Sequence, residues 1–270
     1  MPELPEVEII RQELRARVRG KPIRRVEFRW PRVAALPSAE EMEQRLPGHT
    51  IVDVGRRGKY LIFHLAPADV LIVHLRMTGQ FRVVPPGTEP DKHTHVIITL
   101  DDNCLLQYRD QRKFGRFYLV TQAEEIIGHL GPEPLDPEWT PRELANALQH
   151  RRAPIKALLL DQRIVAGLGN IYADESLFLA GIHPLRAGNT LTAEEITALH
   201  RAIRQVLNEA LAARGSTIAT YIPPSQRGGE YQKQHRVYHR AGQPCPVCGT
   251  PIQRTRVGGR STHYCPHCQR

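Results

Sequence analysis

The spacing of apolar residues predicts that the chain begins with a helix and continues into a region of strands. Positions Leu4, Val7, Ile10, Leu14 and Val18 repeat at helical intervals, which predicts an amphipathic helix over residues 3–19. Short runs rich in β-branched and aromatic residues then follow one another, separated by turn residues. These predicted strands cover residues 24–30, 50–54, 60–65, 70–75, 80–84, 94–100, 103–108 and 116–120. Their spacing favours an antiparallel sandwich or barrel over alternating βαβ units.

The pattern changes to a helical one after a proline-rich segment at residues 131–137, which is a candidate domain boundary. Thr140 precedes a proline and a glutamate at the positions of a capped helix start. Thr192 begins a second capping box, which opens a long amphipathic helix over 192–214. Residues 215–236 are polar and have no apolar period, so they are predicted to form a mobile loop.

The last 34 residues hold four of the five cysteines, in two Cys-x-x-Cys pairs separated by 16 residues. Each pair directs two sulfurs at one ion, and two pairs complete the tetrahedron that zinc prefers. The intervening segment has the length of a two-stranded hairpin with Gly258-Gly259 at its turn, so a zinc ribbon is predicted. Four thiolates leave no open coordination position, which makes this zinc structural. The predicted ligands are Cys245, Cys248, Cys265 and Cys268.

Composition excludes several classes of protein. The chain has 270 residues, 41% of them hydrophobic, which is enough for one large domain or a few smaller ones. No apolar run approaches the length of about 18 residues that a membrane span needs, and the acidic start has no signal-peptide core. An intracellular protein is expected, in which cysteines serve as metal ligands more often than as disulfides.

The positive charge is concentrated in the second half of the chain. The formal net charge is +9, yet residues 1–150 contain 21 basic and 21 acidic side chains, so the excess lies in residues 151–270. The basic residues are mostly arginine, whose guanidinium binds phosphate at two points, although an arginine-rich genome would give the same bias. The asymmetry favours an anionic polymer such as a nucleic acid as the partner.

The first residues offer a candidate nucleophile. Removal of Met1 would expose the amine of Pro2, and an α-amine has a pKa of about 7.7–8.0 against about 10.4 for lysine. A free amine can attack an aldehydic or acetal carbon and form an iminium. Glu3 and Glu6 can share one helix face beside it and act in proton transfer and positioning. Ordinary helix N-terminal chemistry explains the same residues, because proline and acids are favoured in a first turn.

Eight separated segments together resemble the bacterial formamidopyrimidine-DNA glycosylases. Seven are residues 1–8 (MPELPEVE), 56–61 (RRGKYL), 74–79 (HLRMTG), 92–96 (KHTHV), 112–115 (RKFG), 129–135 (HLGPEPL) and 167–175 (GLGNIYADE), and the eighth is the zinc ribbon. They follow in the family's order along the whole chain. The resemblance implies an α+β multidomain fold with an antiparallel β-sandwich and flanking helices (1–131), a helix–two-turn–helix domain (132–222) and a zinc-ribbon finger (237–270). Residues 223–236 would form a mobile loop that covers the lesion.

The resemblance also implies a reaction. The family removes oxidised purines such as 8-oxoguanine and formamidopyrimidines from DNA and then cleaves the strand by two eliminations. Pro2 would attack C1′ and form the Schiff base, Glu3 would protonate the sugar oxygen, and Glu6 would order the site. Lys59 matches the family's catalytic lysine, and Arg260 matches the zinc-finger arginine that holds the lesion's phosphates.

The matching residues also predict the DNA contacts. Base flipping leaves a hole in the duplex, and Met77, Arg112 and Phe114 match the three side chains that fill it. Further contacts to the DNA backbone are predicted for His93, Arg151, Lys156 and Asn170. One segment departs from the family: residues 215–240 lack its usual DGKPGYF stretch, and His239 stands where glycine is typical.

The expected partner is double-stranded DNA containing damaged bases, bound by a monomer with one structural Zn²⁺ in the cytoplasm, at the nucleoid and away from membranes. Three alternatives remain at this point. An endonuclease VIII-like glycosylase for oxidised pyrimidines shares Pro2, Glu3, Glu6 and Lys59, although its start usually has glycine in place of Leu4. A non-catalytic damage-binding protein would use the ribbon and the helices alone. An amino-terminal-proline tautomerase would explain Pro2 but neither the ribbon nor the charge.

Overall fold

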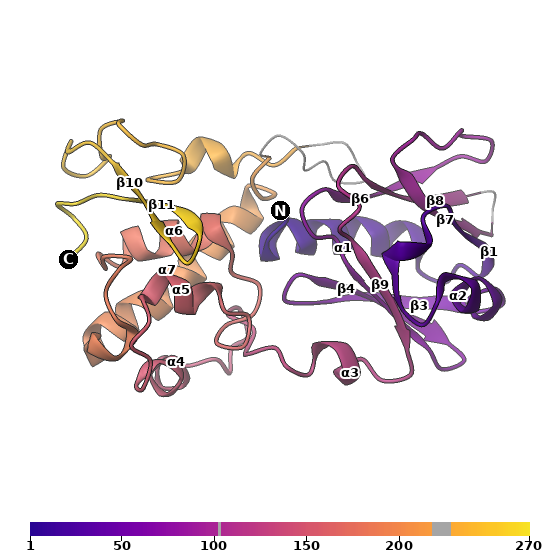
Figure 1. The fold of residues 1–270 in the computed structure, drawn as a ribbon, viewed down its shortest axis with the longest axis horizontal. Helices are drawn as coiled ribbons and strands as arrows, with labels where there is room; N and C mark the ends of the chain where they lie inside the picture. Colours follow the sequence, from indigo (N-terminus) through magenta and orange to yellow (C-terminus); the bar gives the residue numbers. More distant parts are fainter. Residues whose placement is uncertain (102–103, 218–227) are drawn as a thin grey trace. The chain divides into compact units, whose positions relative to one another are not determined.

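The computed structural model describes residues 1–101, 104–217 and 228–270, and it divides into two compact units (Figure 1). The first unit, here the β unit, comprises Met1–His129 and Arg214–Gly229. The second, here the helical unit, comprises Leu130–Ala213 and Glu230–Arg270. None of the helices in the described residues is long and apolar enough to cross a membrane.

Two sheets and a long helix build the β unit. One sheet has the strand order β1-β7-β8-β6 and is antiparallel throughout. The other has the order β2-β9-β5-β4-β3, in which only the β2–β9 pair is parallel. The strands are β1 (Ile23–Phe28), β2 (Ala34–Leu36), β3 (Thr50–Arg57), β4 (Tyr60–Ala66), β5 (Val70–His74), β6 (Gly79–Val84), β7 (Thr94–Leu100), β8 (Cys104–Asp110) and β9 (Arg116–Val120). The helices are α1 (Leu4–Val18), η1 (Pro31–Val33), α2 (Ala39–Arg45) and α3 (Glu124–Ile127).

Helix α1 packs on the second sheet and closes the core of this unit. Its residues Val7, Ile10, Leu14 and Val18 are at most 1% exposed and belong to one apolar cluster with side chains from both sheets. Burial of an aliphatic or aromatic side chain stabilises a fold by about 1.5–3 kcal/mol. The helix predicted for the start of the chain and the antiparallel β-rich region are therefore confirmed.

The helical unit consists of helices followed by a two-stranded hairpin. The helices are α4 (Pro141–Leu148), α5 (Ile155–Leu160), α6 (Asn170–Leu179), η2 (Gly188–Thr190), α7 (Ala193–Ala212) and η3 (Tyr231–Gln234), followed by the strands β10 (Gln253–Val257) and β11 (Arg260–Tyr264). The capping boxes at Thr140 and Thr192 form as predicted. Strand β11 contacts α6, which is buried along most of its length.

The polar segment before the ribbon is only partly described, and its described part is packed. Residues 218–227, which include much of the predicted mobile loop, lie outside the described residues. The prediction of a loop continuing to residue 236 was wrong, because η3 forms there and Tyr231 is fully buried against Tyr172. Apolar periodicity does not detect this packing, since one buried tyrosine and backbone hydrogen bonds hold the segment.

Candidate functional sites

The first turn of α1 buries two carboxylates in the β unit. Glu3 and Glu6 are 3% and 2% exposed, and the backbone N–H of Glu3 donates to Glu6 Oε2 at 2.8 Å. The other oxygen of Glu6 accepts the N–H of Ser216, also at 2.8 Å. Gly215 beside it has φ +81°, and a Cβ there would lie 2.7 Å from Glu6 Oε1. Glu6 thus connects the chain start to the segment that begins at residue 214, and only glycine fits next to it.

Burial and charge together shift the amine at the start of the chain. Its pKa is lowered chiefly because burial disfavours the ammonium form, and the cations Lys59 and Arg112 lower it further. Glu3 and Glu6 act in the opposite direction and raise this pKa. All four side chains are therefore close enough to Met1 to affect its amine electrostatically. This amine is the one on Met1, which precedes the proposed nucleophile Pro2 in the chain.

Lys59 occupies the turn between β3 and β4, next to Gly58, whose φ of +54° a glycine adopts easily. The lysine is only 6% exposed. His74, at the end of β5, is also buried, and its Nδ1 accepts the backbone N–H of Arg76 at 3.0 Å. Burial, with the charges of Arg76 and Lys59, lowers the pKa of His74 to about 3. The imidazole is therefore neutral at physiological pH and orders the turn after β5.

Two turns of the β unit carry the predicted void-filling residues. Phe114 is 46% exposed, and the Arg112 guanidinium lies 4.7 Å from the centre of its ring. Met77 is half-buried in the turn that follows β5. His93, which is also half-buried, precedes β7. An exposed phenylalanine beneath a guanidinium can stack on a base.

Lys156 does not lie on a surface, so the prediction that it contacts DNA directly conflicts with the structure. Its side chain is fully buried, and its ammonium lies 2.6 Å from Asp174 Oδ1. It donates to Thr262 Oγ1 at 2.8 Å and to the carbonyl of Ser261 at 2.9 Å. The N–H of His263 donates to the other oxygen of Asp174 at 2.9 Å. This buried pair joins α5 and α6 to β11, and a lysine that is enclosed in this way cannot reach a phosphate.

The remaining predicted contacts of the helical unit lie near the same hairpin or at its surface. Arg260 is exposed at the first position of β11, directly after the Gly258-Gly259 turn. Asn170 begins α6 and donates its side-chain amide to the carbonyl of Ser261 at 3.0 Å. Arg151 is exposed between α4 and α5. Arginines and a helix N-terminus are typical contacts to a phosphate backbone.

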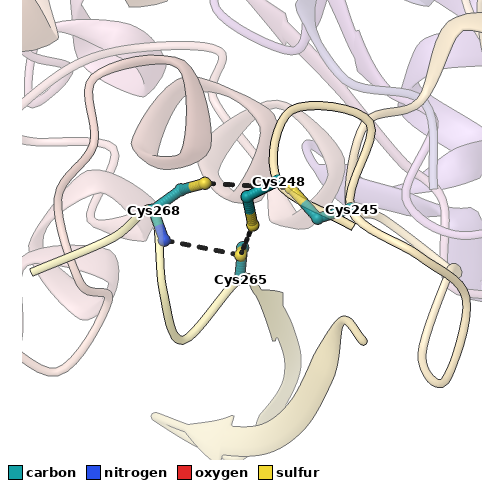
Figure 2. A group of neighbouring side chains, drawn as sticks. All are labelled: Cys245, Cys248, Cys265 and Cys268. Atoms are coloured by element: carbon teal, nitrogen blue, oxygen red, sulfur yellow. Dashed lines mark hydrogen bonds between the residues drawn. The ribbon is translucent and has the colours of Figure 1, made fainter. Parts of the chain in front are cut away.

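The four cysteines converge as zinc ligands in the helical unit (Figure 2). Their sulfurs all lie within 4.8 Å of one another, with Cys245 to Cys268 at 3.9 Å and Cys248 to Cys265 at 3.5 Å. A tetrahedral ion with Zn–S bonds of about 2.3 Å requires sulfurs about 3.8 Å apart. These distances fit one structural zinc, as predicted. When bound, the ion would cross-link the two cysteine pairs and leave no position for substrate.

Two buried carboxylates of α6 had no role predicted from the sequence. Asp174 anchors β11 as described, and Glu175, also fully buried, accepts the backbone N–H groups of Arg236, Val237 and Tyr238 at 2.9 Å each. Burial raises the pKa of Glu175, while these three donors act to lower it. The sequence signals for these residues are an acidic pair in a largely apolar helix and their place in the segment 167–175.

Family models and relatives of known function match this chain along its whole length. The model of the formamidopyrimidine-DNA glycosylase N-terminal domain matches residues 1–117, that of the formamidopyrimidine-DNA glycosylase H2TH domain matches 130–222, and that of a zinc finger found in FPG and IleRS matches 242–270. A formamidopyrimidine-DNA glycosylase of Symbiobacterium thermophilum is 48% identical, with 100% of this chain and 89% of that protein aligned. One from Bacillus subtilis is 46% identical over 100% and 99%.

Solved structures of similar proteins have the same fold. A complex of Lactococcus lactis Fpg with DNA containing an abasic site has a TM-score of 0.93 at 39% identity, covering 99% of each chain. The MutM (Fpg) protein of Thermus thermophilus has a TM-score of 0.90 at 43% identity, covering 99% of this chain and 98% of that one. A complex of the wild-type Lactococcus lactis protein with DNA containing an oxidised pyrimidine has a TM-score of 0.93 at 38% identity, covering 100% of both chains.

Proposed function

The chain belongs to the formamidopyrimidine-DNA glycosylase family, and we propose that it excises oxidised purines from double-stranded DNA and then cleaves the strand. It is a DNA glycosylase of oxidised-base repair. The observation that carries the proposal is the group of buried charged side chains at the chain start: Glu3, Glu6 and Lys59 are 3%, 2% and 6% exposed, and all three act on the terminal amine of Met1, the neighbour of Pro2. Binding of undamaged DNA alone would not need such a cluster.

The reaction follows from the groups at this site. After Met1 is removed, the nitrogen of Pro2 attacks C1′ of the damaged nucleotide, and the bond from C1′ to the base breaks with its electron pair going to the base, which takes up the proton that the Pro2 nitrogen loses. Glu3 gives its proton to O4′ as the sugar ring opens, which leaves an iminium between Pro2 and C1′. Glu6 holds the first turn through the N–H of Glu3 and the segment at Ser216 through a second hydrogen bond. Lys59 moves protons during the eliminations that expel first the 3′ and then the 5′ phosphate.

The DNA contacts divide between the two units. Met77, Arg112 and Phe114 fill the hole left by the flipped nucleotide, and their position on two turns, with Arg112 and Phe114 exposed and Met77 half-buried, supports this role. His93, Arg151, Asn170 and Arg260 contact phosphates, with Arg260 at the lesion. The charge excess in residues 151–270 favours the same assignment.

The proposal extends to the organisation of the chain. Residues 1–131 form the catalytic domain, 132–222 the helix–two-turn–helix domain and 237–270 the zinc finger. A single chain supplies every proposed catalytic residue, which is why we propose a monomer. Because its substrate would be chromosomal DNA, we expect the protein to act in the cytoplasm, at the nucleoid.

Oxidised pyrimidines are the second candidate substrate class. A related Lactococcus lactis protein forms a complex with DNA that contains an oxidised pyrimidine. Release of each damaged base from otherwise identical duplexes separates the two candidates. Faster release of 8-oxoguanine and formamidopyrimidines supports our proposal, and faster release of oxidised pyrimidines contradicts it.

Borohydride trapping on duplex DNA with an abasic site tests the reaction itself. The reductant converts an iminium into a stable covalent adduct, so the wild-type protein should become linked to the DNA. A protein that only binds damaged DNA forms no adduct, and that result would overturn the enzymatic assignment.

A further inference from the structure

Asp110 ends strand β8 at the base of the turn that carries Arg112 and Phe114. It is 1% exposed, and its carboxylate collects hydrogen bonds from several parts of the β unit. Oδ1 accepts the Thr78 hydroxyl and the Arg112 N–H, the latter at 3.2 Å. Oδ2 accepts the Gly115 N–H at 2.8 Å and the Tyr108 hydroxyl at 3.3 Å. The two oxygens thus fix both ends of the 112–115 turn.

The main chain of Asp110 extends the same network to a third segment. Its N–H donates to the carbonyl of His93 at 2.9 Å, and its carbonyl bonds to Nε2 of His95 at 2.8 Å. The segment that leads into β7, which includes a predicted phosphate contact, is therefore attached to the same residue.

Thr78 connects the Met77 turn to the Arg112 turn. Its hydroxyl donates to Asp110 Oδ1 and accepts the N–H of Arg112 at 3.1 Å. Gly79 and Gly115 allow the two turns to close around Tyr108: a Cβ would lie 2.4 Å from the Tyr108 hydroxyl oxygen at Gly79 and 1.7 Å from it at Gly115. No larger residue fits at either position. Met77, Arg112 and Phe114, which are separated in sequence, are thus attached to one buried carboxylate.

We infer that Asp110, acting through Thr78, is a positioning residue that holds the Met77 turn and the Arg112–Phe114 turn as one preformed unit for insertion into the duplex. The inference rests on the proposed function, in which those three side chains replace the flipped nucleotide. Side chains that are ordered before binding lose less conformational entropy when they insert. Asp110 itself touches neither substrate nor reacting atoms, and its effect is confined to steps that need a filled hole.

The test compares duplex with single-stranded DNA, since a single strand has no hole to fill. Borohydride trapping rates are measured at low enzyme concentration on an abasic site in each form, and the ratio of the duplex rate to the single-strand rate is the readout. Asp110→Asn replaces one carboxylate oxygen with an NH2 group, which cannot accept a hydrogen bond. Each oxygen of Asp110 accepts two hydrogen bonds, so the variant loses two of the four. We expect the ratio to fall about tenfold or more.

Two Thr78 variants address the coupling without removing the carboxylate. Thr78→Val keeps the shape of the side chain and removes the hydroxyl, so we expect the ratio to fall by about threefold to tenfold. Thr78→Ser restores the hydroxyl and should recover most of that loss. Because Thr78→Val leaves three of the donors to Asp110 in place, it decides the matter if Asp110→Asn fails to fold.

Asp69 provides the matched control within the same unit. It is also buried, at 8% exposure, and it pairs with Arg45 and His49 rather than with a predicted DNA contact. Asp69→Asn should lower the thermal midpoint of unfolding and leave the duplex-to-single-strand ratio near that of wild type. An equal fall of both rates in Thr78→Val, or a ratio changed as much by Asp69→Asn, would overturn the inference.

The same assay separates this inference from the function on which it rests. If the wild-type protein forms no adduct with either substrate, the proposed function fails. If it forms both adducts and Phe114→Ala lowers the ratio while Asp110→Asn and Thr78→Val do not, the function stands and the positioning role of Asp110 is refuted.

Discussion

The β unit and the end of the helical unit hold their functional residues by different means. In the β unit a single apolar cluster extends through α1 and both sheets, and Glu3 and Glu6 of the candidate active site stand at the start of α1. The apolar cluster at the zinc hairpin has five buried members, two of which are the zinc ligands Cys245 and Cys265. The hairpin is instead attached by the buried ion pair of Lys156 with Asp174 and by the zinc site.

This difference predicts how each region responds to damage. A large apolar core loses stability gradually, because each side chain contributes only a part of the total. A metal site and a buried ion pair fail when one member is lost, since the remaining charge stays buried without its partner. Mutations that break the zinc site or the ion pair near Arg260 should therefore unfold the hairpin as a whole. Mutations near Pro2 should lower the reaction rate and leave the β unit folded.

Loss of a zinc ligand should have the largest effect. Cys248→Ser removes one of the four sulfurs, and structural zinc contributes about 10–16 kcal/mol of folding free energy in small domains. We expect loss of bound zinc and a fall in strand cleavage of about a thousandfold, with the circular dichroism of the β-rich half retained. The control is Val247→Ser, because Val247 is highly exposed and lies between the ligands Cys245 and Cys248. Cleavage at the wild-type rate by zinc-deficient Cys248→Ser would show that the ribbon is dispensable.

Breaking the buried pair comes next. Asp174→Asn leaves the Lys156 ammonium buried without its counter-charge and should cost about 3–5 kcal/mol of local stability. Hydrogen exchange of the amides at 260–264 measures this local loss, and the lesion-cleavage rate should fall with it. Glu230→Gln, which breaks the exposed pair with Lys233, should leave both measurements unchanged. Unchanged exchange in Asp174→Asn would refute the anchoring role.

Acid should destabilise the β unit through His74. The folded state holds this imidazole neutral with a pKa of about 3, against 6.5 for an unperturbed histidine, so unfolded chains bind the proton first. Stability is therefore complete above about pH 6.5 and falls as the pH decreases towards 3. Between pH 7 and pH 5 the loss should be about 2 kcal/mol in the free energy of unfolding.

The His74→Asn variant isolates this contribution. Its side-chain oxygen can accept the Arg76 N–H in place of Nδ1, and it does not titrate in this range. Denaturant unfolding of both proteins at pH 7 and pH 5 should show a smaller loss in the variant. An identical loss would mean that the acid sensitivity arises elsewhere.

The smallest expected effect concerns the pH dependence of the chemistry. Lys59 lowers the pKa of the Met1 amine, and we expect its charge to act in the same way on the nitrogen of Pro2 once Met1 is removed, so Lys59→Met should raise the pKa of that nitrogen. Less free base is then present at a given pH, and the acidic limb of the trapping rate should move to higher pH. Lys21 follows the opposite end of α1, which spans Leu4–Val18, so Lys21→Met should leave the limb in place. A limb that does not move in Lys59→Met would remove the lysine from the electrostatics of the amine.

Periodicity and spacing predicted the parts of the fold that depend on local pattern. The first helix, the antiparallel strands, the two capping boxes and the zinc cysteines all have signals within a few residues of one another. The parallel pairing of β2 with β9 was not predicted, because it joins segments about 80 residues apart in the sequence and β2 is only three residues long.

Buried polar groups explain most of what the sequence did not reveal. From the sequence, Lys156 was predicted to contact a DNA phosphate. Only the folded structure, in which Asp174 of another helix pairs with it, shows that the lysine side chain is buried. Asp110 resembles any acidic residue at a turn until its four donors are known. A polar side chain and its partners are seldom neighbours in sequence, so single-sequence patterns cannot assign them.

The central claim is that the nitrogen of Pro2 forms the bond to deoxyribose. Digestion of the borohydride-trapped protein and mass spectrometry of its N-terminal peptide test this most directly. We expect a peptide that lacks Met1 and carries the reduced sugar on Pro2. A sugar located on Lys59 or any other lysine, or an active protein that retains Met1, would contradict it.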